Sequence, residues 1–155
     1  MTVPEAVSTV RRHLPAPPDV VYDQWLDPEA LADWMCPRPA RCLQVHTEPW
    51  VGGVVRFDIE DSGHQFLVTG QYLTLEPPHR LAFSWSCSTW PDPTVQSIVT
   101  VTLQPHADGQ TLMTIEHAQL PPGLTDQHQR GWNLIADQLA AALALTAGSD
   151  RDTRR

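Results

Sequence analysis

Lysine is missing from this sequence of 155 residues, and all ten of its basic residues are arginines. The chain therefore has no lysine that could form a Schiff base, attack a substrate or act as a general base. Charged residues of both signs are scarce, at 18%, and the acidic excess leaves a formal net charge of −8. This balance disfavours nucleic acid and anionic membranes as partners.

Cysteines are few and follow no paired spacing. Cys36, Cys42 and Cys87 are odd in number and form no C-x-x-C motif, which favours a reducing, cytoplasmic compartment. Cys36, Cys42 and His46 have the spacing C-x5-C-x3-H, but no fourth ligand accompanies them, so we predict no metal site. We also expect no signal peptide, and the longest apolar run near the C-terminus is too short to span a bilayer.

Motifs for common cofactors and nucleophiles are missing as well. The sequence contains no Walker A motif, no G-x-G-x-x-G pattern and no G-x-S-x-G pattern. Acidic residues do not pair at positions typical of acid/base catalysis. We therefore expect no cofactor, and nucleophilic catalysis finds no support beyond isolated serines and cysteines.

The longest regular segment is the last one, from Thr125 to Thr146. Its large apolar side chains recur at intervals of three or four residues, at Trp132, Ile135, Leu139 and Leu143. This spacing predicts an amphipathic helix with one buried face. Gly148 marks the predicted end of the helix and of a single domain over residues 1–148, and we expect residues 149–155 to form a disordered tail.

The chain before this helix reads mainly as strands joined by short turns. Alternation of apolar and polar residues predicts strands over about 7–14, 41–48, 54–60, 66–75, 81–87, 99–103 and 111–117. Two short helices, 19–26 and 29–35, follow the first strand, each introduced by a proline. Consecutive strands with short connections favour an antiparallel sheet. The predicted fold is α+β, with a curved antiparallel sheet of about seven strands wrapped around the long C-terminal helix.

Several of these segments carry a resemblance to a known family. They are Pro28-Glu29-Ala30-Leu31 with Trp34, Gly52-Gly53, the run from Gly70 to Trp85, Gly109 with Thr111 and His117, and Gly131-Trp132. Together they resemble the helix-grip superfamily, which includes START lipid-transfer domains, Bet v 1-like proteins and polyketide cyclases. Within it the chain is most similar, over roughly residues 7–145, to stand-alone bacterial relatives of the C-terminal domain of the activator of Hsp90 ATPase. One departure is Pro17, which stands where such proteins commonly have a capping serine.

The resemblance implies a cavity between the long helix and the concave face of the sheet. Inward-facing residues of the predicted strands, together with the helix stripe, could wall a pocket for a small hydrophobic or aromatic ligand. The candidate ligand-binding residues are Trp34, Phe57, Phe66, Tyr72, Phe83, Trp85, Met113, His117, His128, Trp132 and Ile135. The alternative is a core that these bulky side chains fill completely. Trp90, in the loop after the fifth strand, is a candidate lid or packing anchor.

Three functions fit the sequence. The first is binding of a small hydrophobic molecule. The second is an enzyme of the polyketide cyclase, aromatase or hydrolase type, in which His117 and Tyr72 would be the catalytic acid/base pair. The third is a protein-interaction module for a chaperone of the Hsp90 type, and the outer face of the sheet also makes a homodimer possible. Family likeness alone does not choose among them.

Overall fold

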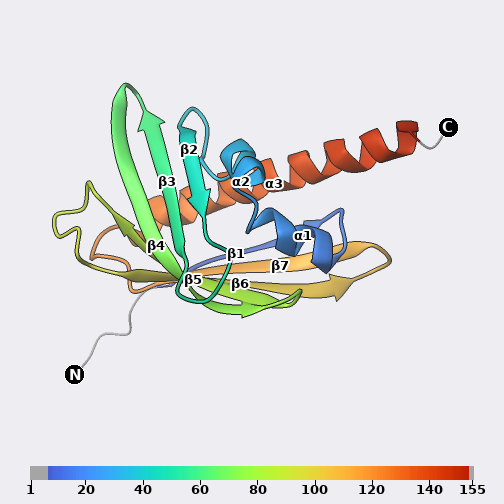
Figure 1. The fold of residues 1–155 in the computed structure, drawn as a ribbon, viewed down its shortest axis with the longest axis horizontal. Coiled ribbons are helices and arrows are strands. Elements are labelled where there is room, and N and C mark those ends of the chain that lie inside the picture. The colour runs from blue at the N-terminus through green and yellow to red at the C-terminus, as the bar shows by residue number, and fades with distance from the viewer. Residues whose placement is uncertain (1–6, 154–155) are drawn as a thin grey trace.

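The computed structural model describes residues 7–153 and contains seven strands and three helices (Figure 1). In chain order these are β1 (Ser8–Leu14), α1 (Pro18–Gln24), α2 (Pro28–Trp34), β2 (Arg41–Thr47), β3 (Val54–Asp61), β4 (His64–Glu76), β5 (Arg80–Cys87), β6 (Ser97–His106), β7 (Gln110–Ala118) and α3 (Thr125–Thr153). This order of elements is the one that the sequence predicts.

The seven strands form one antiparallel sheet in the order β1-β7-β6-β5-β4-β3-β2. From β2 to β7 every strand pairs with its neighbour in sequence. The two edge strands are β2 and β1, and β1 pairs with β7 so that Ser8 lies opposite His117. The sheet bends strongly, so that β2 to β4 stand at an angle to the remaining strands and α3 lies across the concave side (Figure 1). The predicted α+β helix-grip architecture is therefore confirmed.

One side of the sheet supplies the core, as the alternation of residue types predicts. In β6 the side chains of Val99, Val101 and Leu103 are fully buried, whereas the intervening residues are partly exposed. Gly70 in β4 is required by a close approach of strands, because a Cβ atom there would lie 1.7 Å from the carbonyl oxygen of Ser84. Burial on one face is what holds the sheet against α3.

Helix α3 buries the stripe that its sequence predicts, and two glutamines fix its position. Trp132 is buried together with Ile135, Ala136, Leu139 and Leu143. Gln129 accepts hydrogen bonds from the Ser8 hydroxyl (2.8 Å) and the Thr9 amide (2.9 Å), and donates to the Thr9 carbonyl (2.8 Å). Gln138 donates to the carbonyls of Trp34 (3.0 Å) and Cys36 (2.7 Å). The helix is thus tied to edge strand β1 and to the loop after α2.

The end of α3 differs from the prediction. The helix continues past Gly148 to Thr153, because a single glycine lowers helix stability by only about 1 kcal/mol and does not by itself terminate a helix. The predicted disordered tail therefore overlaps the helix over residues 149–153, and residues 154–155 lie outside the described part of the chain.

The two short helices begin in different ways. Asp27 caps α2 by accepting a hydrogen bond from the amide of Glu29 at 3.0 Å, whereas Pro17 caps α1 without any side-chain bond. Both helices are anchored by buried tryptophans, because Trp25 and Trp34 pack edge to face with ring centroids 4.8 Å apart. This aromatic pair fills the α1–α2 end of the concave face.

Two of the three cysteines form a disulfide that the sequence argument missed. Cys36, just after α2, is bonded to Cys42 in β2, and Cys87 is the free, buried cysteine. An odd number of cysteines without a C-x-x-C motif gives no sign of this pair, because the end of α2 and the start of β2 come together only in the folded chain. With Cys36 and Cys42 paired, cysteine usage no longer favours a reducing compartment, and the cytoplasmic location stays a prediction. In the part of the chain that the structure describes, no helix has the length and apolar character needed to cross a bilayer.

Candidate functional site

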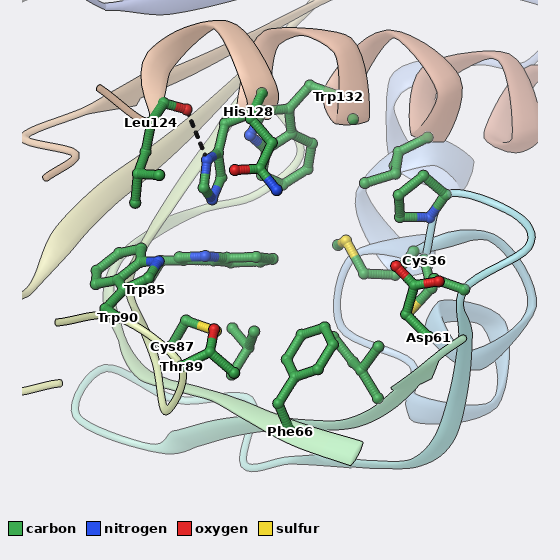
Figure 2. Close-up of a pocket in the computed structure, with 18 of the residues that line it drawn as sticks. Cys36, Asp61, Phe66, Trp85, Cys87, Thr89, Trp90, Leu124, His128 and Trp132 are labelled. Atoms are coloured by element: carbon green, nitrogen blue, oxygen red, sulfur yellow. Dashed lines mark hydrogen bonds between the residues drawn. The ribbon is translucent and has the colours of Figure 1, made fainter. Parts of the chain in front are cut away.

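A pocket of about 460 Å³ lies between the first turns of α3 and the curled sheet (Figure 2). Its aromatic walls are Phe66 from β4, Trp85 from β5, Trp90 from the loop after β5, and Trp132 from α3. The other apolar contributors are Met35, Pro37, Ala40, Ile59, Val68, Pro91, Leu124, Gly131 and Ile135.

The polar groups of the pocket are few. Cys87 and Thr89 bond to each other, with the sulfur and the hydroxyl oxygen 3.1 Å apart. Asp61 accepts a hydrogen bond from the Ser62 hydroxyl at 3.1 Å and lies at the far end of the pocket from His128 (Figure 2). Cys36, Gln127 and His128 are the other polar lining residues. Within residues 7–153 no group of three or more His, Cys, Asp or Glu side chains is arranged to hold a metal ion.

His128 is one of two polar residues of α3 that line the pocket, with Gln127, and its ring points inward (Figure 2). Its Nδ1 lies 2.9 Å from the carbonyl oxygen of Leu124, which can only accept, so Nδ1 carries a proton. In the neutral ring Nε2 is then an unprotonated acceptor, and no described residue bonds to it. Burial lowers the pKa of His128, and the bond to Leu124 only partly opposes this effect. The ring is therefore neutral at pH 7.

His117 stands behind the pocket wall in a closed hydrogen-bond chain. The indole N–H of Trp132 donates to its Nδ1 at 2.9 Å, so the neutral ring is protonated on Nε2, which donates to the Ser97 hydroxyl at 2.7 Å. Ser97 in turn donates to the carbonyl of Trp85 at 2.7 Å. Burial, followed by the nearby His128, lowers the pKa of His117 to about 3. Both ring nitrogens are occupied, and the ring is fully buried.

Tyr72 lies in the core rather than in the pocket. Its hydroxyl donates to the carbonyl of Trp25 at 3.3 Å, and burial raises its pKa far above the ordinary value. Neither Tyr72 nor His117 lines the pocket. The acid/base pair of the enzyme hypothesis therefore has no access to a ligand there.

The structure divides the candidate ligand-binding residues into two groups. Five line the pocket: Phe66, Trp85, His128, Trp132 and Ile135. Six pack in the core instead: Trp34, Phe57, Tyr72, Phe83, Met113 and His117. The reason is that Trp25 enters the concave face and packs against Phe83 and Trp132, with ring centroids 6.3 Å away in both cases. The pocket lies on the other side of Trp132, among residues that Trp25 does not cover.

Sequence reasoning missed the wall that follows α2. Met35, Cys36, Pro37 and Ala40 belong to an irregular loop without hydrophobic periodicity. Their position depends on distant residues, because Gln138 of α3 holds the loop through the carbonyl of Cys36. The sequence offers no local signal for this wall, because the disulfide between Cys36 and Cys42, which links the loop to β2, is visible only in the folded structure.

The chain matches the family model described as "Activator of Hsp90 ATPase homolog 1-like protein" over residues 15–144. The chain belongs to this family. The match spans every element from the loop before α1 to most of α3, and it confirms the resemblance drawn from the sequence.

Several solved structures share the fold of this member of the activator of Hsp90 ATPase homolog 1-like family. Protein CV1439 from Chromobacterium violaceum is similar at 31% identity and a TM-score of 0.77, with 88% of this chain and 96% of that chain covered. Protein NE0264 from Nitrosomonas europaea (24% identity, TM-score 0.77, 92% and 96% covered) and the AHSA1 protein SPO3351 from Silicibacter pomeroyi (22%, 0.75, 91% and 99%) share the fold. None of the curated proteins compared with the chain matches it.

Proposed function

We propose that this member of the family binds a small, mainly apolar or aromatic molecule in the pocket between α3 and the sheet. The observation that carries the proposal is the cavity of about 460 Å³ walled by Trp85, Trp90 and Trp132. Sites for small molecules usually enclose roughly 300–1,000 Å³ and combine apolar walls with few polar groups. No contact or cavity among the described residues favours a second function, so we advance none.

Gly131 offers a direct test because it lies in α3 at the pocket wall. A Cβ atom there would meet only Pro37, at 4.0 Å, so alanine fits without a clash. A leucine at the same position would extend beyond the Cβ into the space between α3 and the loop after α2. Gly131→Leu therefore fills the pocket, and Gly131→Ala is the matched control.

We expect the uncharged fluorescent probe N-phenyl-1-naphthylamine to bind the wild-type protein saturably. Gly131→Leu should weaken binding at least tenfold, whereas Gly131→Ala should bind the probe nearly as well as the wild type. Because alanine favours the helix more than glycine does, the free energy of unfolding of Gly131→Ala should be about 0.5–1 kcal/mol higher than that of the wild type. Fluorescence titration and urea unfolding measure the two effects. Equal binding by the leucine variant, or no saturable binding by the wild type, would contradict the proposal.

A further inference from the structure

The pocket contains one carboxylate and no described cation. Asp61 contributes the carboxylate, and none of the described arginines is among the lining residues. Arg38 and Arg41 line a separate hollow that shares only Cys36 and Ala40 with the pocket. Binding an anionic ligand would cost desolvation energy, and the ligand would be repelled by Asp61 with no described basic side chain in the pocket to offset the cost. The chain's net charge of −8 adds to this repulsion at long range.

The same pocket presents an unused hydrogen-bond acceptor. His128 uses Nδ1 for the Leu124 carbonyl, so Nε2 is left as a lone pair at the wall, facing inward (Figure 2). Two aromatic rings pack edge to face against the His128 ring. Its ring centroid lies 5.2 Å from that of His117 and 6.2 Å from that of Trp90. His117 cannot satisfy His128, because Trp132 and Ser97 occupy both of its ring nitrogens.

From these two observations we infer that the ligand is an uncharged aromatic molecule bearing a hydrogen-bond donor, such as a phenolic hydroxyl or an aryl N–H, which bonds to Nε2 of His128. The negative charge of Asp61, at the other end of the pocket, weakens the binding of ligands that carry a carboxylate. The inference rests on the proposed function and narrows it to a ligand class. Trp85, Trp90 and Trp132 supply the faces and edges against which an aromatic ring packs.

Three naphthalenes of matched size separate the effects of donor and charge. 2-Naphthol carries a hydroxyl donor and is neutral at pH 7, because phenols ionise near pH 10. 2-Methoxynaphthalene keeps the oxygen but has no donor. 2-Naphthoate is an anion. Each competes with N-phenyl-1-naphthylamine for the wild-type protein at pH 7, and the displacement curves give relative affinities.

We expect 2-naphthol to bind about fivefold more tightly than 2-methoxynaphthalene, the ratio that corresponds to a net hydrogen bond of about 1 kcal/mol. 2-Naphthoate should bind at least tenfold more weakly than 2-naphthol. His128→Phe should abolish the preference for the hydroxyl, whereas His128→Gln, which retains an acceptor, should keep part of it. Asp61→Asn should raise the affinity for 2-naphthoate severalfold. Asp108→Asn removes the same charge in the exposed β6–β7 turn and should change nothing.

Failure of this inference can be told from failure of the proposed function. If N-phenyl-1-naphthylamine does not bind, both are overturned. If the probe binds but the hydroxyl gives no advantage over the methyl ether in the wild type, the inference alone is overturned. A preference for the hydroxyl that persists in His128→Phe, or 2-naphthoate binding as tightly as 2-naphthol, would overturn it too. The ranking in the wild type decides the matter even if a His128 variant folds poorly.

Discussion

Replacing Trp132 with alanine is expected to lower the free energy of unfolding by about 3–5 kcal/mol, the range for large aromatic side chains deleted from a core. Trp132 is 2% exposed and packs against Trp25, Trp85 and His117, with ring centroids 5.5–6.3 Å away. The truncation would also leave Nδ1 of His117 buried without its donor. Urea unfolding followed by far-ultraviolet circular dichroism measures the loss.

Trp132→Phe separates packing from hydrogen bonding. Phenylalanine keeps most of the apolar surface but cannot donate to His117, so we expect a smaller loss of about 1–3 kcal/mol. Leu134→Ala is a control on the same helix, because Leu134 is 48% exposed and should contribute little. A loss below 1 kcal/mol for Trp132→Ala would show that this face of α3 does not anchor the core.

Acid is expected to destabilise the protein through His117 well before most carboxylates titrate. The pKa of this buried ring is lowered to about 3 in the folded state, against about 6.5 for an unperturbed histidine. The unfolded chain therefore binds more protons between these values, and stability falls as the pH drops through this window. From pH 6.5 to 4.5 we expect a loss of about 2–3 kcal/mol from this one group.

The lowered pKa of His128, the titratable ring facing His117, acts in the same direction. The measurement is the free energy of unfolding at several pH values between 7 and 4.5. His117→Gln cannot titrate, so its profile should be flatter over this range although the variant is less stable at pH 7. His64→Gln, at an exposed position in the sheet, serves as the control. A wild-type profile that is level down to pH 4.5 would contradict the closed hydrogen-bond chain.

The sequence predicts best those features that depend on residue spacing within a single helix or strand. The stripe on α3 is read correctly because Trp132, Ile135 and Leu139 recur with the period of a single helix, and their burial follows from that period alone. The strands are read correctly for the same reason, with a period of two. The twist of a long run of antiparallel strands predicts that the sheet curves around α3, and the resemblance to the helix-grip superfamily adds the cavity between helix and sheet.

The pocket was harder to predict. A residue lines it only if it lies at the right position along its strand, and facing the concave side of the sheet is not sufficient. Phe83 and Trp85 point to the same side of β5, yet Phe83 packs against Trp25 and Trp85 reaches the cavity. That difference comes from Trp25, which belongs to a segment after α1 and fills one end of the concave face. Likewise the role of His117 depends on partners distant in sequence, Ser97 and Trp132, which occupy both of its nitrogens.

Binding in the pocket beside Trp132 can be observed directly, because three of the six tryptophans of the chain line this pocket. The decisive measurement is a titration of the nitrogen-15-labelled protein with N-phenyl-1-naphthylamine, in which the indole N–H signals are followed by NMR. We predict that the signals of Trp85, Trp90 and Trp132 shift together and saturate, whereas those of Trp34 and Trp50, which do not line the pocket, stay in place. Unchanged signals from the three pocket indoles while the probe binds, or shifts confined to the exposed Trp50, would show that the probe does not enter this pocket.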